Sequence, residues 1–324
     1  MIHVVPMIKT MPDNTARAWT ADDVPDQHGR VCLITGGNSG LGLASARVMA
    51  ARGAAVVIAC RDEGRGRTAL EHLRQQCPGA SIELRRLDLA CLADIRAFAE
   101  DWRMHAGRLD VLMNNAGLMA IPPARTIDGF EMQLGVNHFG HFALTLALLP
   151  VLFASPGSRI VNVSSAMHTR GQMDFDDLFF DRRPYNGWTA YSQSKLANML
   201  FTLELDRRLK KARSSTLAVA AHPGYAATEL QGKGPRLRGA KLAEIGMRIG
   251  NALVAQSADA GAWPQLRAAT DPDVRGGEYF GPTGFMGLRG PAAQVDPAPQ
   301  ARDASAAAQL WNVSERLTGT RFPG

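Results

Sequence analysis

From residue 31 onward, short apolar runs rich in β-branched residues alternate with longer segments in which apolar residues recur every three or four positions. The short runs predict buried strands, and the longer spacing predicts helices. Strands that are apolar throughout are typical of a parallel sheet covered by helices on both faces. The predicted strands are Val31–Thr35, Ala54–Cys60, Ser81–Leu89, Leu109–Asn114, Arg159–Ser164 and Thr216–Ala221, and the predicted helices include Leu41–Arg52, Glu63–Gln76 and Leu92–His105.

No linker divides this alternation and no internal repeat is visible, so the sequence predicts one α/β domain. We expect a doubly wound domain over residues 28–289, with about seven mostly or wholly parallel strands and helices on both faces. An N-terminal extension (1–27) precedes it, and a C-terminal extension with a short helix (290–324) follows. Two segments interrupt the alternation, an insert rich in aromatic residues and aspartate (166–190) and a loop rich in Gly, Lys and Arg (225–245). We expect the insert to line the substrate site and the loop to act as a lid.

The composition permits a large core, because 46% of the 324 residues are hydrophobic and 20% are charged. The longest apolar run, Leu144–Phe153, is shorter than the roughly 18 residues of a membrane span and contains Pro150. Residues 1–30 lack the basic start and the small-residue cleavage site of a signal peptide. We therefore expect a soluble, cytoplasmic protein without a membrane anchor.

The net charge of +6 and the pI of about 9.4 make nucleic acid a partner to consider. The basic residues are spread along the chain, and the two small clusters at 210–213 and 233–241 are not interleaved with aromatic residues. We expect no nucleic-acid partner, and a basic balance also suits a cofactor that carries several phosphates. The four cysteines form no C-x-x-C or Cys/His cluster, so we expect free thiols and no metal site.

A glycine-rich turn joins the first predicted strand to the first predicted helix, with the sequence T-G-G-N-S-G-L-G from Thr35 to Gly42. Glycines let the backbone turn tightly and approach a pyrophosphate, whose charge then meets free N–H groups at the helix N-terminus. Three glycines alone are a weak signal, but their place between a strand and a helix strengthens it. The predicted pyrophosphate-binding residues are Gly36, Asn38, Ser39, Gly40, Leu41 and Gly42.

The end of the second predicted strand bears on which cofactor binds. An acidic residue here would bind the ribose 2′-hydroxyl of NAD, whereas an arginine can hold the 2′-phosphate of NADP. Cys60 stands where the acid is expected, Arg61 follows it, and Asp62 can cap the next helix. We therefore expect NADP(H), with NAD(H) as the less favoured alternative.

Tyr191 and Lys195 are four positions apart, which on a helix places a phenol and an amine on one face. In this composition a chance Tyr-x-x-x-Lys is expected roughly 0.07 times, and an ordinary exposed helix pair is the alternative interpretation. The context favours chemistry, because Ser164 and Ser165 end another predicted strand. Ligands bind at the carboxyl ends of the strands in an open parallel sheet.

In order and setting, these motifs resemble the short-chain dehydrogenase/reductase family over about residues 28–282. Within that family the chain is similar to the branch that contains retinol dehydrogenases and protochlorophyllide reductases. The resemblance implies a single Rossmann domain and an NAD(P)-dependent oxidoreductase. The motifs that carry it are the glycine spacing above, Ala59–Asp62, Asn114–Gly117, Val136–Phe142, the Tyr191–Lys195 pair, Ser194–Asn198, and His222–Gly224 followed by Thr228–Leu230.

The resemblance also implies a role for each matching residue. Tyr191 would be the general acid/base, and Lys195 would lower the pKa of that tyrosine and hold the nicotinamide ribose. Ser165, rather than its rival Ser164, would hydrogen-bond the reacting oxygen, and Asn137 would order a water that links Lys195 to solvent. The other implied cofactor contacts are Asp88 and Leu89 at the adenine, Asn115, Ala116 and Gly117 at the adenine ribose side, Thr228 at the carboxamide, and Pro223 and Gly224.

We therefore expect an NADP-dependent enzyme that interconverts a hydrophobic alcohol and its ketone or aldehyde. The aromatic insert favours a bulky apolar substrate. One alternative is a non-catalytic NADP-binding sensor, against which the intact Ser165, Tyr191 and Lys195 argue. The other is an isomerase, epimerase or lyase on the same fold, for which residues 283–324 are too few to supply a substrate domain. The resemblance implies a homodimer or homotetramer, and the sequence does not fix the number.

Overall fold

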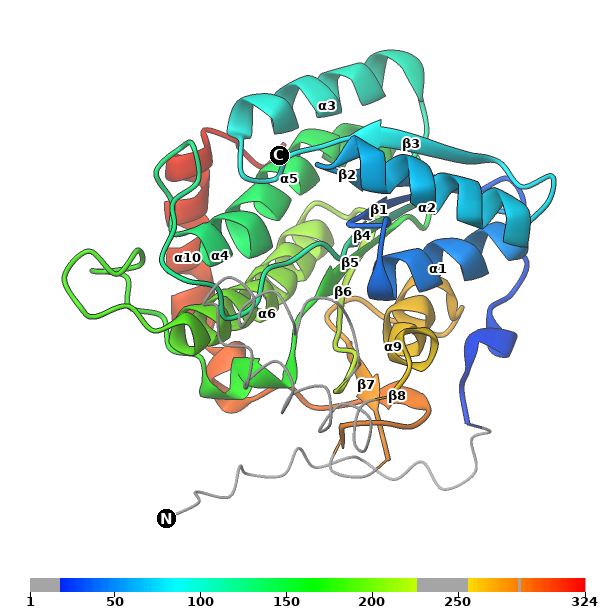
Figure 1. The fold of residues 1–324 in the computed structure, drawn as a ribbon. Coiled ribbons are helices and arrows are strands. Elements are labelled where there is room, and N and C mark those ends of the chain that lie inside the picture. The colour runs from blue at the N-terminus through cyan, green and yellow to red at the C-terminus, as the bar shows by residue number, and fades with distance from the viewer. Residues whose placement is uncertain (1–17, 226–255, 285–286, 324) are drawn as a thin grey trace.

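The sheet organises the part of the chain that the computed structural model describes, residues 18–225, 256–284 and 287–323 (Figure 1). Over these residues eight strands lie in the order β3-β2-β1-β4-β5-β6-β7-β8. All neighbouring strands are parallel except β7 and β8, which are antiparallel at one edge. This confirms the predicted doubly wound α/β fold and adds an antiparallel edge strand.

Strands β1 to β6 follow the six predicted runs closely, whereas β7 and β8 correspond to no predicted run. They are β1 (Val31–Thr35), β2 (Ala55–Cys60), β3 (Ile82–Arg86), β4 (Val111–Asn114), β5 (Arg159–Val163), β6 (Leu217–Ala221), β7 (Tyr279–Pro282) and β8 (Ala292–Gln294). The helices are α1 (Gly40–Ala51), α2 (Glu63–Gln76), α3 (Leu92–His105), α4 (Met132–Leu134), α5 (His141–Phe153), α6 (Gly187–Lys211), α9 (Ala258–Thr270) and α10 (Ala304–Thr318), with shorter turns η1 (Ala21–Asp23), η2 (Gly135–Gly140), η3 (Ala166–Arg170) and η5 (Pro299–Arg302).

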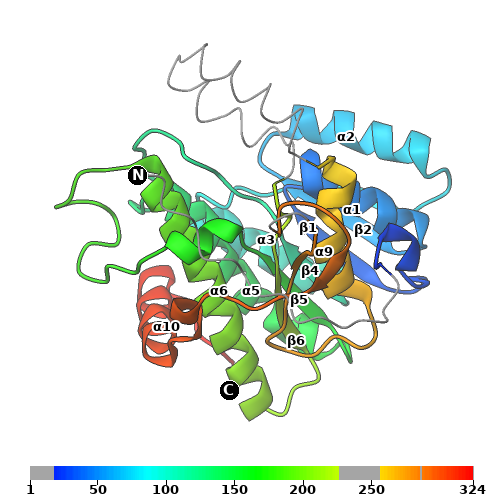
Figure 2. The ribbon, with the colours of Figure 1, turned by 90° about the horizontal axis from the view of Figure 1, so that it is seen from below.

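Alternation along the strands divides the core into two layers. In β1, Cys32 and Ile34 pack with helices α1, α2 and α9, while Leu33 between them packs on the opposite face. Successive strand side chains point to opposite faces, so a strand buried on both sides must be apolar throughout. Helices α3, α5, α6 and α10 cover the second face, and the two helical layers are seen on either side of the sheet in Figure 2.

Helices α4, η2 and α5 form one continuous helix, Met132–Phe153, whose central part is π-helical. Among the helices of the described residues, this one is long and apolar enough to cross a membrane. The apolar run Leu144–Phe153, noted in the sequence, was too short for that because it covers only the second half of the helix. However, 83% of its most apolar window is buried within the domain. A helix that is apolar all round and enclosed by protein is typical of a core helix.

The segments predicted as extensions pack onto this domain. Trp19 forms a bridge with Ala292 of β8. Helix α10 lies along α6 in both ribbon views, and its Trp311 ring packs 5.1 Å from the ring of Phe142 and 5.9 Å from that of Phe201. Both ends of the described chain therefore contribute to the two layers.

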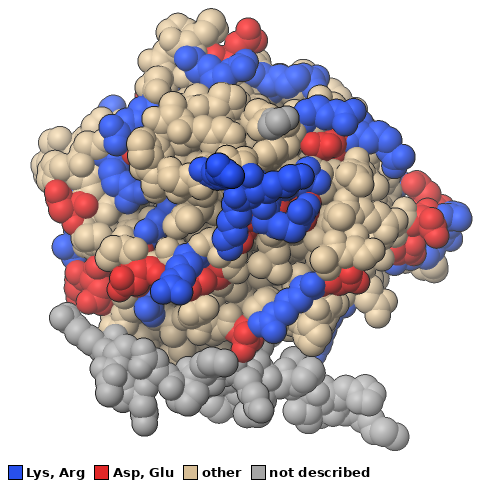
Figure 3. Space-filling view, turned by 180° about the vertical axis from the view of Figure 1, so that it is seen from behind, with Lys and Arg blue, Asp and Glu red and all other residues tan. Residues whose placement is uncertain are grey.

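Charge on the surface is dispersed. On the face opposite that of Figure 1, Lys and Arg side chains form separate groups interrupted by acidic and uncharged surface (Figure 3). A hollow of about 570 Å³ lies between β3 and α3. Its Arg85 is already paired with Glu83 at 2.7 Å and with Asp101 at 3.1 Å. These charges satisfy one another and do not converge on a ligand.

Three buried histidines predict sensitivity to acid. Burial lowers the pKa of His138 to about 3, of His141 to about 4 and of His222 to about 3. The unfolded chain binds protons at these side chains below about pH 6.5, whereas the folded chain does not until about pH 4. Stability is therefore fully present above about pH 6.5 and is lost as the pH falls, by about 2 kcal/mol per histidine at about pH 5.

His138→Gln tests this prediction, because its amide reaches the same distance as Nε2, which lies 2.8 Å from Ser314 Oγ. We expect the loss in free energy of unfolding between about pH 7 and pH 5, measured in urea, to be smaller than in the wild type by about 2 kcal/mol. The control is His105→Gln, because His105 is exposed. An equal loss in the wild type and in His138→Gln would contradict the prediction.

Candidate active site

A groove of about 250 Å³ lies where β1, β2 and β4 end at the N-terminus of α1. This is the edge of a parallel sheet at which ligands bind. Of the residues predicted to bind the cofactor, those lining the groove are Gly36, Asn38, Ser39, Gly40, Leu41, Arg61, Asp88, Leu89, Asn115, Ala116 and Gly117.

The backbone geometry of the turn between β1 and α1 requires glycine at three positions. Gly36 and Gly40 have φ values of +67° and +52°, in the left-handed region that favours glycine. Gly42 does not line the groove but lies against the turn, where a Cβ would come within 2.6 Å of Asn115 Nδ2 and closer still to the Gly36 carbonyl oxygen. Ser39 at the N-cap of α1 makes no side-chain capping hydrogen bond. The first turn of α1 therefore offers N–H groups to an anion, and these residues fit a dinucleotide pyrophosphate.

Thr35, at the end of β1, ties two of the groove's walls together. Its hydroxyl accepts the N–H groups of Asn115 and Ala116, each at 3.0 Å. It also lies 2.9 Å from Nε2 of the buried His141. The sequence drew attention to Thr35 only as part of the glycine motif and to His141 only as part of a family motif, and it gave no signal that the two side chains meet.

Cys60, Arg61 and Asp62, the residues expected to face the adenine ribose, line one part of the groove. Asp62 accepts the Arg65 N–H at 3.0 Å and so caps α2, as anticipated. Burial raises the pKa of the Cys60 thiol, and that side chain is therefore neutral. Arg61 is exposed and lines the groove. Asp88 at the neighbouring wall accepts the N–H of Ala90 at 2.9 Å.

Helix α6 carries the predicted catalytic tyrosine inward. Tyr191 is 5% exposed. Burial raises the pKa of its phenol to about 12, and the Ser165 hydroxyl acts on that pKa in the opposite direction. The structure therefore brings together two side chains that are far apart in sequence, at the carboxyl end of β5 and the start of α6.

Lys195 lies one helical turn further along α6. Its ammonium donates to the Val163 carbonyl at 2.9 Å and lies 5.8 Å from the centre of the Tyr191 ring. Burial lowers the pKa of Lys195 to about 8. A Cβ on Gly117 would lie 3.6 Å from this ammonium. Because Gly117 lines the groove, the lysine lies next to one of its walls, although neither Lys195 nor Tyr191 is among the lining residues.

The two candidate serines point to different partners. The Ser164 hydroxyl is buried and donates to the Lys195 backbone carbonyl at 2.9 Å. The Ser165 hydroxyl accepts the Met167 N–H at 3.2 Å and reaches Tyr191. The structure thus brings Ser165, rather than Ser164, to the tyrosine.

Asn137 occupies the π-helical segment η2. Its side chain accepts the Leu118 N–H at 2.8 Å and donates to the Leu118 carbonyl at 3.0 Å and to Ser194 Oγ at 2.9 Å. π-helical turns are frequent at functional sites. The asparagine joins the groove wall after β4 to α6, and its expected part in ordering a water stays a prediction.

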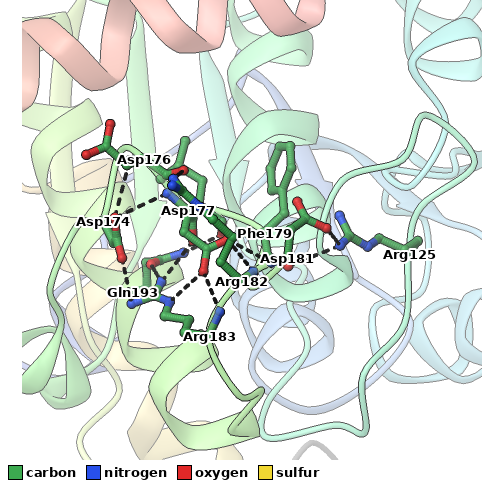
Figure 4. A network of polar contacts seen from close by, with 10 residues as sticks. Arg125, Asp174, Asp176, Asp177, Phe179, Asp181, Arg182, Arg183 and Gln193 are labelled. Carbon is green, nitrogen blue, oxygen red and sulfur yellow. Dashed lines mark hydrogen bonds and ion pairs between the residues drawn. The ribbon is translucent and has the colours of Figure 1, made fainter.

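The insert between Ser165 and α6 is held by a network of carboxylates and arginines, in which Asp177 makes the most backbone contacts (Figure 4). Asp177 accepts the backbone N–H groups of Asp181, Arg182 and Arg183 at 2.7 to 3.2 Å. The Arg183 side chain donates to Gln193 of α6 at 2.7 Å. These contacts give the insert a fixed shape against α6.

One aromatic residue of the insert, Trp188, lies beside Tyr191. The Trp188 ring meets the Tyr191 ring edge-on at 6.2 Å and is 42% exposed. The Tyr185 hydroxyl donates to Glu131 at 3.1 Å and accepts from Gln133 at 2.9 Å. An apolar surface therefore stands beside the phenol.

The remaining predicted positions follow β6. Pro223 accepts a hydrogen bond from Gln256 at 2.7 Å, and Gly224 has a φ of +64°. Thr228 and nearly all of the predicted lid lie outside the described residues. Among the residues that the structure does describe, no group of three or more His, Cys, Asp or Glu side chains could hold a metal ion.

Comparison with known proteins shows the family. Residues 30–236 match the family model described as short chain dehydrogenase. The chain is 41% identical to Retinol dehydrogenase 13 of Homo sapiens over 91% of its length and 86% of the relative's. It is also 41% identical to Polyprenol dehydrogenase of Mus musculus, with the same coverage. A crystal structure of an uncharacterized protein from Mycobacterium Paratuberculosis, 43% identical, covers 95% of this chain and is itself covered fully, with a TM-score of 0.79.

Proposed function

The chain belongs to the short chain dehydrogenase family, and from this premise we propose that it is an NADP-dependent enzyme that interconverts a hydrophobic alcohol and its ketone or aldehyde. The observation that carries the proposal is the approach of Tyr191 to Ser165, with Lys195 one turn away and next to Gly117 of the groove wall. The relatives named for retinol and polyprenol support an alcohol/carbonyl oxidoreductase.

Tyr191 and Ser165 have different roles in carbonyl reduction. When bound, the nicotinamide cofactor supplies the hydride. The Tyr191 phenol, which burial keeps protonated at neutral pH, donates its proton to the carbonyl oxygen as negative charge develops there. The Ser165 hydroxyl hydrogen-bonds the same oxygen and stabilises that charge.

Alcohol oxidation runs the same steps in reverse and requires the tyrosine as a phenolate. A pKa of about 12 makes the phenolate scarce at neutral pH. A positive charge nearby favours the ionised phenol, and Lys195 is the cation on the same face of α6.

The preference for NADP is proposed from the three residues after β2. Cys60 is buried and neutral, and Asp62 is engaged as a helix cap, so neither offers a free carboxylate to a ribose 2′-hydroxyl. Arg61 lines the groove and is exposed, and an arginine can grip a phosphate with two hydrogen bonds.

Arg61→Ala is expected to raise the Kd for NADPH about ten- to a hundredfold and to leave the Kd for NADH nearly unchanged, because only NADPH carries the 2′-phosphate. Titration of both cofactors by their fluorescence checks the ratio. The matched control is Arg67→Ala, because Arg67 is an exposed arginine of α2 that pairs with Glu63 at 3.2 Å. An unchanged ratio in Arg61→Ala would refute the 2′-phosphate role.

The hydrophobic substrate is proposed from the insert. The partly exposed Trp188 ring packs beside Tyr191, and the insert that leads to it is tied to α6 through Arg183 and Gln193. Apolar walls with a few polar groups are the usual lining of a site for a bulky apolar ligand.

A direct assay tests the whole proposal. NADPH or NADH is supplied with decanal, retinaldehyde, acetophenone or a short polar aldehyde, and cofactor oxidation is followed by absorbance. We expect turnover with NADPH and the apolar carbonyls, and slower turnover with NADH or the polar aldehyde. Tight NADPH binding without turnover of any carbonyl, or of the matching alcohols with NADP⁺, would favour a non-catalytic cofactor-binding protein instead.

A further inference from the structure

We propose that His168 is a positioning residue for Ser165, and that the backbone of Ala298 in the segment after β8 holds His168 in the tautomer this task needs. The inference rests on the proposed function, because it concerns the serine that would bind the reacting oxygen. It gives the segment between β8 and α10 a part in the active site.

The His168 ring bridges two distant parts of the chain. Its Nδ1 lies 2.7 Å from the Ser165 carbonyl oxygen, and its Nε2 accepts the Ala298 N–H at 3.0 Å. The side chain is fully buried, at 0% exposure. Tyr279 packs edge-on against the ring at 5.4 Å, and its hydroxyl is a more distant neighbour of Nδ1 at 3.5 Å.

These two partners fix where the proton of the imidazole lies. A carbonyl oxygen can only accept a hydrogen bond, so Nδ1 must carry the proton. A backbone N–H can only donate, so Nε2 must be bare. Burial lowers the pKa of His168, which keeps the ring neutral and lets both contacts persist.

Holding the Ser165 carbonyl also orients the Ser165 hydroxyl. Ser165 is the N-cap of the short turn η3, with extended backbone at φ −159°. His168 stands three residues later on the same turn, where its backbone N–H binds the Ser165 carbonyl at 3.0 Å and its side chain binds the same carbonyl at 2.7 Å. The hydroxyl that reaches Tyr191 leaves the same residue, so a rotation of this peptide would move it away from the reacting oxygen.

A second contact from the same C-terminal segment reaches the turn without touching the ring. Gln300 Nε2 donates to the Thr169 carbonyl at 2.7 Å and to the His168 carbonyl at 3.4 Å. This contact supplies a control, because it stabilises the same turn but has no influence on the tautomer of His168.

Two substitutions separate the two hydrogen bonds of the ring. The amide nitrogen of asparagine stands as many bonds from the backbone as Nδ1, so His168→Asn keeps a donor for Ser165 and loses the acceptor for Ala298. Glutamine reaches as far as Nε2, so His168→Gln keeps an acceptor for Ala298 and loses the donor for Ser165. Each variant loses one buried hydrogen bond, and a purely structural role predicts similar effects from both.

The assay uses NADPH with decanal or retinaldehyde, whichever the wild-type chain reduces faster. We expect His168→Gln to lower kcat about ten- to a hundredfold, as a misplaced catalytic group does, with KM and the Kd for NADPH nearly unchanged. His168→Asn is expected to stay within a few-fold of the wild-type kcat. In the Ser165→Ala variant, adding His168→Gln should lower kcat little further, because the Ser165 hydroxyl that His168 positions is already absent.

The backbone donor is tested by Ala298→Pro. The φ of Ala298 is −59°, which proline adopts, so the change removes the N–H without altering this backbone angle. We expect a lower kcat than in Gln300→Ala. Spectra of ¹⁵N-labelled histidine, with the His168 signals assigned from the His168→Asn difference, should show the Nδ1–H tautomer in the wild type and its loss or mixing in Ala298→Pro.

The outcomes distinguish this inference from the proposed function. If Ser165→Ala turns over as fast as the wild type, both are overturned. If Ser165→Ala is impaired but His168→Gln and His168→Asn lose kcat equally, or if His168→Gln adds its full loss to Ser165→Ala, only the positioning role is overturned. An Nε2–H tautomer in the wild type overturns the assignment irrespective of activity.

Discussion

Replacing Tyr191 by Phe is expected to lower kcat by roughly a factor of 10³ to 10⁴ while leaving the Kd for NADPH within about twofold of the wild type. The substitution removes one oxygen, and with it the proton that the carbonyl oxygen must receive. The ring stays, so the packing of the buried side chain against Trp188 is retained. Turnover of the apolar carbonyls and titration with NADPH give the two numbers.

Tyr185→Phe is the matched control for Tyr191→Phe. It removes a phenolic oxygen of the same insert region that hydrogen-bonds Glu131 and Gln133 rather than Ser165. We expect it to lower the free energy of unfolding by about 1 to 3 kcal/mol, because buried partners lose a hydrogen bond, and to change kcat only modestly. Equal losses of turnover and NADPH binding in Tyr191→Phe would mean that Tyr191 is structural.

Replacing Lys195 by Met is expected to slow alcohol oxidation by a factor of about 10² to 10³ and to slow carbonyl reduction less. Below the Lys195 pKa of about 8 the side chain is an ammonium, which favours the phenolate of Tyr191, so over that pH range its removal makes the phenolate scarcer. Oxidation needs the phenolate, and its rate rises with pH until the phenol ionises. The rising limb of its pH profile should therefore shift to higher pH in Lys195→Met. Reduction needs the protonated phenol, and its decline at high pH should shift in the same direction.

The pH profiles of both directions in the wild type and in Lys195→Met check this shift. Lys210→Met is the control, because Lys210 lies on the same helix and pairs with Asp206 at 2.6 Å, away from the tyrosine. A loss of rate in Lys195→Met with pH profiles superimposable on the wild type would show that the lysine does not act on the pKa of Tyr191.

The fold could be predicted from the sequence wherever a pattern reports on burial. Strand β1 is apolar at Cys32, Leu33 and Ile34 because neighbours cover both of its faces, and that continuity is visible in sequence. The edge strand β8 is only three residues long and carries no such continuity, so it was not among the predicted strands. Its pairing with β7 depends on tertiary contacts.

The same distinction applies to the site. Gly36 and Gly40 could be predicted because a left-handed backbone selects glycine directly. The choice of Ser165 over Ser164 came from the family resemblance, and the coordinates supplied its physical reason, since neighbouring residues at a strand end have the same chemistry and differ only in direction. His168 left no trace in the sequence, because its partner Ala298 contributes a backbone N–H, which every residue except proline possesses.

Helix α10 gives the chain its own covering for the outer sides of α5 and α6. Its Trp311 fills the space between Phe142 and Phe201, and the Arg208 guanidinium stacks on that indole at 4.2 Å. On this side of the molecule, Trp311 is already enclosed by residues of its own chain. A second copy could contact α5 and α6 here only if α10 were first displaced. Quaternary contacts, where they form, are therefore expected elsewhere on the molecule.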